Sequence, residues 1–187
     1  MNEPELWLVR HGETTWSRDR RHTGRTDLPL TPEGEAAATA LAPRLRDVEF
    51  DLELSSPLQR ARRTAELAGL SPSVEPNAAE WDYGDYEGVT TMEIRRTVPG
   101  WRVWAGPVPN GETIQEVARR AEAVIARVRA EARTRAILVA HGHFSRILAM
   151  RWLDLSPDDG EHLRMGTATV SVLGWDRGIP IVERWNA

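Results

Sequence analysis

The sequence contains neither cysteine nor lysine, and each absence removes a class of chemistry. Without cysteine there is no disulfide framework, and thiolate phosphatases and thiol proteases are excluded. Without lysine there is no Schiff-base amine, no P-loop lysine and no kinase lysine. Apart from histidine, the basic side chains are therefore all arginines.

Long apolar runs and an overall positive charge are also missing. No apolar stretch approaches the roughly 20 residues needed to cross a bilayer. The first residues, Met1–Glu5, are acidic and polar, unlike those of a signal peptide. The formal net charge of -4 provides no overall attraction to nucleic acid or to an anionic membrane. We therefore expect a cytoplasmic protein with no nucleic-acid and no membrane partner.

The chain length and the apolar pattern predict one α/β domain. An apolar fraction of 41% and a charged fraction of 28% over 187 residues are ordinary for a globular protein. Short apolar runs alternate with longer helical stretches, which predicts a sandwich with a mostly parallel central sheet flanked by helices, as a single domain over residues 1–187. We find no internal repeat and no low-complexity linker.

The expected elements follow from apolar periodicity and from capping residues. Thr31 with Pro32 begins one helix, and Ser56 with Gln59 is interpreted as a capping box that begins another. The expected strands are 6–9, 52–55, 74–76 and 136–140, followed by a terminal hairpin of 167–175 and 180–185. The expected helices are 31–46, 56–69, 114–133 and one that follows His143 and ends at Trp152.

Two histidine loops directly follow predicted apolar strands. They are Arg10-His11-Gly12 and His141-Gly142-His143. In open α/β sheets, ligands bind at the carboxyl ends of strands, so both loops can face one pocket. Two alternatives are open: each histidine is structural, or the histidines bind zinc. The zinc alternative lacks a nearby cysteine and an HExxH pattern.

Six short blocks of sequence, two of which contain these histidine loops, occur in order along the chain. The blocks are 8–14, 23–34, 55–65, 80–88, 110–113 and 139–143. Together they resemble the signatures of the histidine phosphatase superfamily, the phosphoglycerate-mutase-like clan. This resemblance implies the three-layer fold of that clan and a phosphohistidine mechanism. The loop 79–88 in particular is similar to bacterial acid phosphatases and sedoheptulose-bisphosphatase-like members.

The resemblance implies three catalytic roles. His11 matches the nucleophile that becomes phosphorylated, Glu80 the proton donor, and His141 the second active-site histidine. A neutral imidazole suits the first role, because a phosphate monoester carries about -1.5 to -2 charges and repels an anionic nucleophile. A carboxylic acid can protonate the leaving oxygen and then accept a proton from the attacking water.

The resemblance also implies a phosphate-binding set. Arginine binds two phosphate oxygens with a planar fork and stays charged, and a protonated histidine would add a further donor. Ser17 stands where many family members have a phosphate-contacting asparagine, although serine has a shorter reach. The implied set is Arg10, Arg60, His141, Ser17, Thr23 and Gly24. No metal ion and no cofactor enter this scheme.

Three functions are compatible with these residues. A non-catalytic binding domain is disfavoured, because every residue of the catalytic set is present. A mutase must retain its intermediate and exclude water, which suits covering segments, whereas the stretch 88–110 is short. We therefore predict a metal-independent, histidine acid-type phosphatase that hydrolyses phosphate monoesters of small metabolites through a phosphohistidine on His11. A phosphoglycerate mutase-type phosphotransferase is the alternative.

Some properties are not determined by the sequence. The physiological substrate is one of them, and a homodimer is an open alternative to a monomer. Several residues could either touch substrate or be structural, with core packing as the default for tryptophan. These residues are Glu13, His22, Glu112, His143, Arg146, Trp101 and Trp104.

Overall fold

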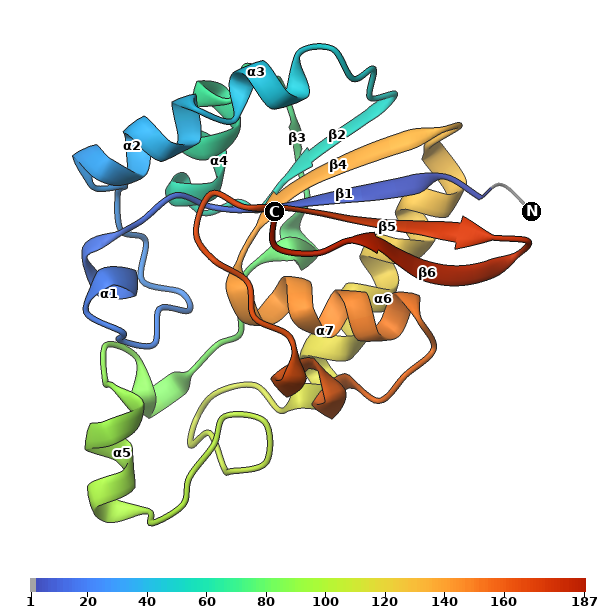
Figure 1. Cartoon of the computed structure of the whole chain (residues 1–187). Helices are drawn as coiled ribbons and strands as arrows, with labels where there is room; N and C mark the ends of the chain where they lie inside the picture. Colours follow the sequence, from blue (N-terminus) through green and yellow to red (C-terminus); the bar gives the residue numbers. More distant parts are fainter. Residues whose placement is uncertain (1–2) are drawn as a thin grey trace.

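The computed structural model describes residues 3–187, in which six strands form one sheet (Figure 1). The sheet order is β3-β2-β4-β1-β5-β6. The pairs formed by β3, β2, β4 and β1 are parallel, whereas β5 and β6 join antiparallel. The strands are β1 (Glu5–Arg10), β2 (Leu52–Ser55), β3 (Ser73–Val74), β4 (Arg135–Ala140), β5 (Val170–Asp176) and β6 (Ile179–Arg184).

Helices cover both faces of the sheet, which confirms the predicted three-layer α/β sandwich (Figure 1). One face carries α2 (Pro32–Thr39), α3 (Ala42–Leu45) and α4 (Gln59–Leu67). The other face carries α6 (Ile114–Glu131) and α7 (Gly142–Trp152). Shorter elements lie in the connections: α1 (Thr15–Arg18), α5 (Thr91–Thr97) and the 3₁₀ turns η1 (Pro76–Ala78), η2 (Gly84–Tyr86) and η3 (Pro157–His162).

A hydrophobic core lies on each face of the sheet, because successive side chains of the central strands point to opposite faces. In β4, Ala136 and Leu138 pack with α6 and α7, whereas Ile137 and Val139 pack with α3 and α4. Each of these four side chains is fully buried. Because β4 is covered on both faces, it reads as one continuous apolar run, as expected for a central parallel strand.

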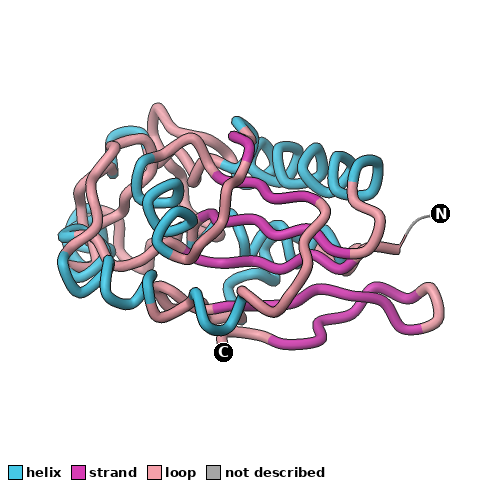
Figure 2. Tube along the Cα trace, turned by 90° about the horizontal axis from the view of Figure 1, so that it is seen from above, coloured by secondary structure: helices cyan, strands magenta, loops and turns pink. Residues whose placement is uncertain are grey.

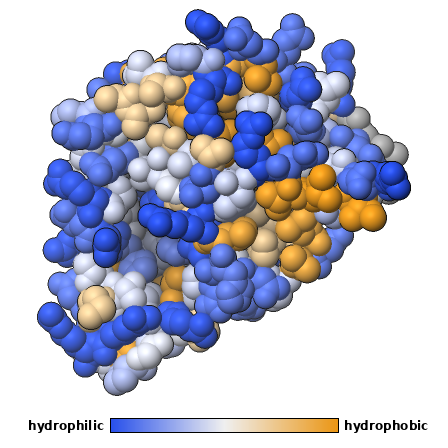
Figure 3. Space-filling model, viewed as in Figure 1, coloured by the Kyte–Doolittle hydropathy of each residue, from blue (hydrophilic) through white to orange (hydrophobic). Residues whose placement is uncertain are grey.

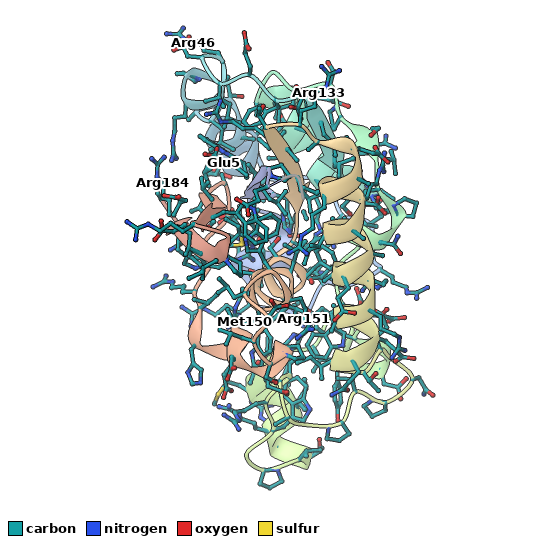
Figure 4. All side chains as sticks on the ribbon, turned by 90° about the vertical axis from the view of Figure 1, so that its right-hand side faces the viewer. Glu5, Arg46, Arg133, Met150, Arg151 and Arg184 are labelled. Carbon is teal, nitrogen blue, oxygen red and sulfur yellow. The ribbon has the colours of Figure 1, made fainter. Side chains whose placement is uncertain are left out.

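The loops that follow the parallel strands gather at one end of the molecule (Figure 2). The amino ends of β1 and β4 lie at the opposite end, which Figure 4 views directly and where it labels Glu5 and Arg133. The β5–β6 hairpin points toward that opposite end, as Figure 1 shows. Among residues 3–187, no helix combines the length and the apolar character required to cross a membrane.

The structure differs from the predicted elements on the helical face of α2–α4. The predicted helix 31–46 is two helices, because Pro43 lacks an N–H and its ring would clash with a preceding carbonyl in a continuous helix. The predicted capping box of Ser56 and Gln59 is wrong. Helix α4 begins at Gln59 with Leu58 as its N-cap, and its first N–H, that of Gln59, donates to Oδ1 of Asp27 at 2.8 Å. The side chain of Gln59 instead donates to the carbonyl of Asp27.

Two other differences concern short elements. The predicted edge strand 74–76 is β3, which begins one residue earlier and ends two residues earlier, because Pro76 begins a 3₁₀ turn. Helices α1 and α5 were not predicted. Helix α5 carries a capping box of Thr90 and Glu93, whose spacing is visible in the sequence.

Candidate active site

The two histidine loops leave adjacent parallel strands side by side. Arg10 at the end of β1 is in register with Ala140 at the end of β4. The next residues, His11 and His141, are therefore neighbours, with ring centroids 5.1 Å apart. Both residues are buried. The structure thus brings together the two predicted histidines, which are distant in the sequence.

His11 has one ring nitrogen fixed and the other available. Its Nδ1 lies 2.7 Å from the carbonyl oxygen of Gly12. Because a carbonyl only accepts hydrogen bonds, Nδ1 carries the proton and Nε2 keeps its lone pair. Burial, followed by the charges of Arg60 and Arg10, holds the pKa of His11 well below its usual value. His11 is therefore neutral at physiological pH and suited to nucleophilic attack through Nε2.

His141 has both ring nitrogens occupied. Its Nδ1 accepts from Nε of Arg60 at 3.2 Å, so Nε2 carries the proton and donates to Oγ of Ser56 at 2.6 Å. Burial, followed by the charges of Arg60 and of other cations nearby, holds the pKa of His141 well below its usual value. These contacts and the lowered pKa favour a neutral His141, and its action as a protonated phosphate donor stays a prediction.

A cavity of about 630 Å³ opens at this end of the sheet. Figure 3 shows the hollow beside α1 and above α5, bordered by strongly hydrophilic side chains. Its lining includes the predicted residues Arg10, His11, Ser17, Thr23 and Glu80. Three predicted residues, Gly24, Arg60 and His141, are not among the described residues that line the cavity.

Arg10 presents an unpaired donor in this cavity wall. Its Nη1 donates to the carbonyl of Met165 at 2.5 Å. Its Nε is buried and has no hydrogen-bond partner among residues 3–187. A buried unsatisfied donor costs about 1–3 kcal/mol, which an anion bound in the cavity would offset. Gly142 allows the guanidinium to lie against the start of α7, because a Cβ there would be 3.2 Å from its Cζ.

Arg60 lies behind the cavity wall and holds a loop. It is fully buried. Beyond its bond to His141, it donates to the carbonyls of Thr23, Gly24 and Thr26 at 3.2, 2.8 and 2.9 Å. In this arrangement Arg60 positions the 23–26 loop and His141, and its direct contact with phosphate stays a prediction.

The remaining phosphate-binding predictions have mixed support. The N–H of Gly24 already donates to Oε1 of Glu87 at 2.8 Å, so it is not available to phosphate. The Ser17 hydroxyl lines the cavity but donates to the carbonyl of Thr14 within the capping box of α1. The Thr23 hydroxyl likewise donates to the carbonyl of Arg21. A phosphate contact by either hydroxyl would require it to exchange that bond.

Glu80 is fixed at the amino end of α7. Its Oε1 accepts from the backbone N–H groups of Trp81 and Phe144, at 2.9 and 2.8 Å. Within residues 3–187, its Oε2 accepts only from the N–H of His143, at 3.1 Å. Each carboxylate oxygen has two lone pairs, so Oε2 keeps one site for a proton. Glu80 and His11 line the same cavity, which suits a proton donor beside a nucleophile.

Arg120, which is ion-paired with Glu112, holds the backbone of the Glu80 loop. This role was not predicted from the sequence. Arg120 on α6 donates to the carbonyls of Asn77, Ala79 and Glu80. Its Nε and Nη2 also form a paired contact with the carboxylate of Glu112, at 2.8 and 2.7 Å. Glu112 is therefore a positioning residue. The signal in the sequence was its spacing, because Arg120 stands three residues after Val117 and four before Val124, beside the apolar stripe of the helix.

An aromatic cluster forms a second wall of the cavity. The hydroxyl of Tyr83 lies 2.6 Å from Nδ1 of His143. Burial raises the pKa of Tyr83 well above its usual value and lowers that of His143, so both stay neutral. Burial also lowers the pKa of His22 to about 4. Trp104 lines the cavity, whereas Trp101 is buried and donates to the carbonyl of Pro107.

The described residues offer no arrangement typical of a metal centre. No group of three or more His, Asp or Glu side chains within residues 3–187 is placed to hold an ion. The site instead combines a neutral imidazole with an unprotonated Nε2, a buried guanidinium N–H without a partner among the described residues, and a carboxyl group with one open position. These are the parts required to bind a phosphoryl group, accept it on nitrogen and protonate its leaving oxygen.

Curated proteins with similar sequences include two named as phosphatases and one named as a probable phosphoglycerate mutase. An acid phosphatase of Mycobacterium tuberculosis is 41% identical over 178 residues, covering 93% of this chain and 88% of that protein. A sedoheptulose 1,7-bisphosphatase of Saccharomyces cerevisiae is 36% identical, covering 81% of this chain and 68% of that protein. A protein of Klebsiella pneumoniae named probable phosphoglycerate mutase is 31% identical, covering 97% and 89%.

The fold and the family model agree with these relatives. A solved structure of a Mycobacterium tuberculosis protein is 38% identical, with a TM-score of 0.92 and coverage of 98% of this chain and 97% of that chain. The family model described as the histidine phosphatase superfamily, branch 1, matches residues 6–187. This chain therefore belongs to branch 1 of the histidine phosphatase superfamily.

Proposed function

We propose that this protein is a metal-independent phosphatase that hydrolyses phosphate monoesters of small metabolites through a phosphohistidine on His11. The observation that carries the proposal is the state of His11 at the cavity. Its Nδ1 is tied to the carbonyl of Gly12, and its neutral ring leaves Nε2 as the nucleophile.

The first chemical step transfers the phosphoryl group to nitrogen. Nε2 of His11 attacks phosphorus, and the bond between phosphorus and the leaving oxygen breaks. Glu80 donates its proton from Oε2 to that oxygen, which leaves as an alcohol. Phosphoryl transfer depends mainly on positioning and on stabilising the equatorial oxygens. Arg10 supplies a charged donor for this purpose at the same wall of the cavity.

The second step regenerates the enzyme. A water molecule attacks phosphorus, and Glu80, now a carboxylate, accepts one of its protons. The nitrogen–phosphorus bond breaks, the lone pair returns to Nε2, and inorganic phosphate leaves. Each of the two steps uses Glu80 in the opposite protonation state, so a single carboxyl group serves both.

The mutase alternative differs only in the acceptor of the phosphoryl group. The higher identity to an acid phosphatase, 41% against 31% for the relative named as a mutase, favours water as the acceptor. Activity of the acid type is supported by the lowered pKa of His11, because the nucleophile stays neutral in mildly acidic solution. The cytoplasmic location, and the absence of cofactor, nucleic-acid and membrane partners, stay predictions from composition.

A panel of phosphate monoesters, measured for phosphate release with and without EDTA, tests this proposal. A parallel assay follows phosphoryl exchange between 3-phosphoglycerate and 2-phosphoglycerate. We expect phosphate release that EDTA does not reduce, and little exchange. Exchange faster than phosphate release would establish the mutase alternative, and a loss of activity restored by one divalent ion would refute the metal-free mechanism.

A further inference from the structure

Glu87 is a half-buried carboxylate that is not among the described residues lining the cavity. Its Oε1 accepts from the backbone N–H groups of Gly24 and Thr26, at 2.8 and 3.0 Å. Its Oε2 is buried and has no hydrogen-bond partner among residues 3–187. A buried carboxylate oxygen without a donor is costly unless a positive charge nearby compensates it.

That positive charge is Arg60, on the other side of the 23–26 loop. Arg60 is fully buried, and its partners within residues 3–187 are His141 and three carbonyls of this loop, with no carboxylate in direct contact. Burial lowers the pKa of Arg60, and negative charges that include Glu87 oppose this effect. The two opposite charges therefore attract each other across the loop.

The peptide group between Thr23 and Gly24 joins the two charges. A trans peptide group points its N–H and its C=O in opposite directions. Here the N–H of Gly24 donates to Oε1 of Glu87 at 2.8 Å, and the C=O of Thr23 accepts from Nη2 of Arg60 at 3.2 Å. Hydrogen bonds in such a chain polarise one another, and each of these two ends on a charged group. The peptide group is thus held between a carboxylate and a guanidinium.

Gly24 allows the loop to lie directly against the segment that carries Glu80. A Cβ at Gly24 would be 2.4 Å from the carbonyl oxygen of Trp81 and 2.8 Å from Oε2 of Glu87. The same two segments are also joined by the ion pair of Arg25 with Asp82, at 2.6 Å, in which Arg25 is exposed. Exposed ion pairs contribute little to stability, so we expect the buried Glu87 contact to fix the loop.

Arg60 transmits the position of this loop to the histidines. Its Nε donates to Nδ1 of His141 at 3.2 Å, and the ring of His141 lies 5.1 Å from that of His11. A shift of Arg60 would therefore disturb the group beside the nucleophile. Glu80 would keep its place, because the N–H groups at the start of α7 hold its carboxylate.

We infer that Glu87 is a positioning residue for phosphoryl transfer, whose negative charge holds Arg60 through the 23–26 loop and so keeps His141 in place beside His11. The inference rests on the proposed phosphatase function and adds to it a residue outside the cavity. Glu87 supports the groups around the phosphoryl group, whereas protonation of the leaving oxygen belongs to Glu80. The two roles therefore differ in how they depend on the leaving group.

The variant Glu87→Gln tests the role of the charge, because glutamine keeps the length of the side chain and an acceptor oxygen. We expect kcat/KM to fall by about tenfold, and by the same factor for an alkyl phosphate and for para-nitrophenyl phosphate. Inhibition by inorganic phosphate should also weaken. Arg25→Gln, which removes the exposed ion pair between the same segments, should change kcat/KM by less than about twofold. A loss that is larger for the alkyl phosphate would show that Glu87 acts through Glu80, and the inference would be wrong.

A double-variant cycle tests whether the charge acts through Arg60. Residues that act as a unit have effects that do not add, so Glu87→Gln in the Arg60→Gln background should change kcat/KM by less than about twofold. Removing one charge leaves the other buried without compensation. The double variant should therefore unfold at a higher temperature than Arg60→Gln alone, a comparison that applies even if a single variant folds poorly. Additive losses of activity, or a double variant no more stable than Arg60→Gln, would contradict the coupling.

An NMR signal of His141 separates a failure of this inference from a failure of the proposed function. Its Nε2–H is buried and donates to Oγ of Ser56 at 2.6 Å, so its proton should exchange slowly and be observable without substrate. His141→Ala identifies the signal, which should shift in Glu87→Gln and keep its position in Arg25→Gln. If no ester is hydrolysed but this pattern holds, only the proposed function fails. An unshifted signal in folded Glu87→Gln overturns the role of Glu87 whether or not the protein is a phosphatase.

Discussion

The loops after β1 and β4 have similar sequences and positions, yet their histidines have different chemistry. His11 and His141 both follow a central strand, both are buried, and both have a lowered pKa. His11 is bound at one nitrogen by a backbone carbonyl, whereas His141 is bound at both nitrogens by Arg60 and Ser56. The two proposed roles, nucleophile for His11 and support for His141, therefore rest on the hydrogen-bond partners of each ring and not on its burial.

The largest expected effect is the difference between the variants His11→Ala and His141→Ala. His11→Ala should abolish turnover together with the acid-labile phosphoenzyme, because it removes the proposed nucleophile, and the other histidines of the cavity, His22 and His143, belong to its aromatic wall. His141→Ala should slow the reaction but still form phosphoenzyme, since His141 positions its neighbours. Acid quenching with labelled substrate measures both. Phosphoenzyme in His11→Ala, or its complete loss in a folded His141→Ala, would reverse the assignment.

Glu80→Gln should give the next largest effect. Glutamine keeps the approximate size of the side chain but cannot donate the proton. For alkyl phosphates, whose leaving oxygen is strongly basic, phosphoenzyme formation should slow by about 10²–10⁴-fold. For para-nitrophenyl phosphate the loss should be smaller, because the phenolate leaves without much assistance. Rapid-quench measurement isolates this step, and equal losses for both leaving groups would exclude Glu80 as the general acid.

Arg120→Gln should reduce activity less than Glu80→Gln does, because it changes only the position of Glu80. Arg120 holds the backbone of the Glu80 loop at three carbonyls, so its removal should misplace the proton donor. We expect kcat to fall by about tenfold for alkyl phosphates, or about 1.4 kcal/mol in the barrier, with a smaller loss for para-nitrophenyl phosphate. Arg119→Gln, on the same helix but exposed, is the matched control. A loss that does not depend on the leaving group would indicate a general structural role.

The framework of this site could be predicted from the sequence. The runs 6–9 and 136–140 are continuously apolar, which is typical of parallel strands that are covered on both faces of a sheet. The polar residues that follow two such strands then lie at the same edge of the sheet. The convergence of His11 and His141 follows from that topology. The resemblance to the family contributed Glu80, which lies on a loop and has no periodic signal of its own.

The hydrogen-bond partners could not be predicted, because they depend on how distant loops fold onto the site. Arg60 was assigned to phosphate from its motif, but the 23–26 loop brings its carbonyls to the guanidinium. Ser56 was assigned to a helix cap, but the fold places its hydroxyl beside His141. Short polar elements such as α1 and α5 bury few side chains, so apolar periodicity did not reveal them.

The smallest expected effect concerns the protonation of His11. A histidine with the ordinary pKa of about 6.5 changes from about 90% neutral at pH 7.5 to about 90% protonated at pH 5.5. Because burial holds the pKa of His11 well below that value, its ring signals in a histidine NMR titration should hardly change over this interval. A histidine-containing peptide under the same conditions provides the reference, and His11→Ala identifies the signal. A midpoint near 6.5 for His11 would contradict the neutral nucleophile.

The lowered pKa values of the buried histidines also determine whether the folded protein becomes more or less stable as the pH falls. Below pH 6.5 the unfolded chain binds protons at His11, His141 and His143 that the folded chain excludes. Their contribution to the free energy of unfolding is therefore fully present above about pH 6.5. It declines as the pH falls toward the lower pKa values of the folded protein. The midpoint of thermal unfolding, measured from pH 7.5 down to 5.5, should decrease steadily, and a midpoint that rises over this interval would show that these histidines are charged in the folded protein.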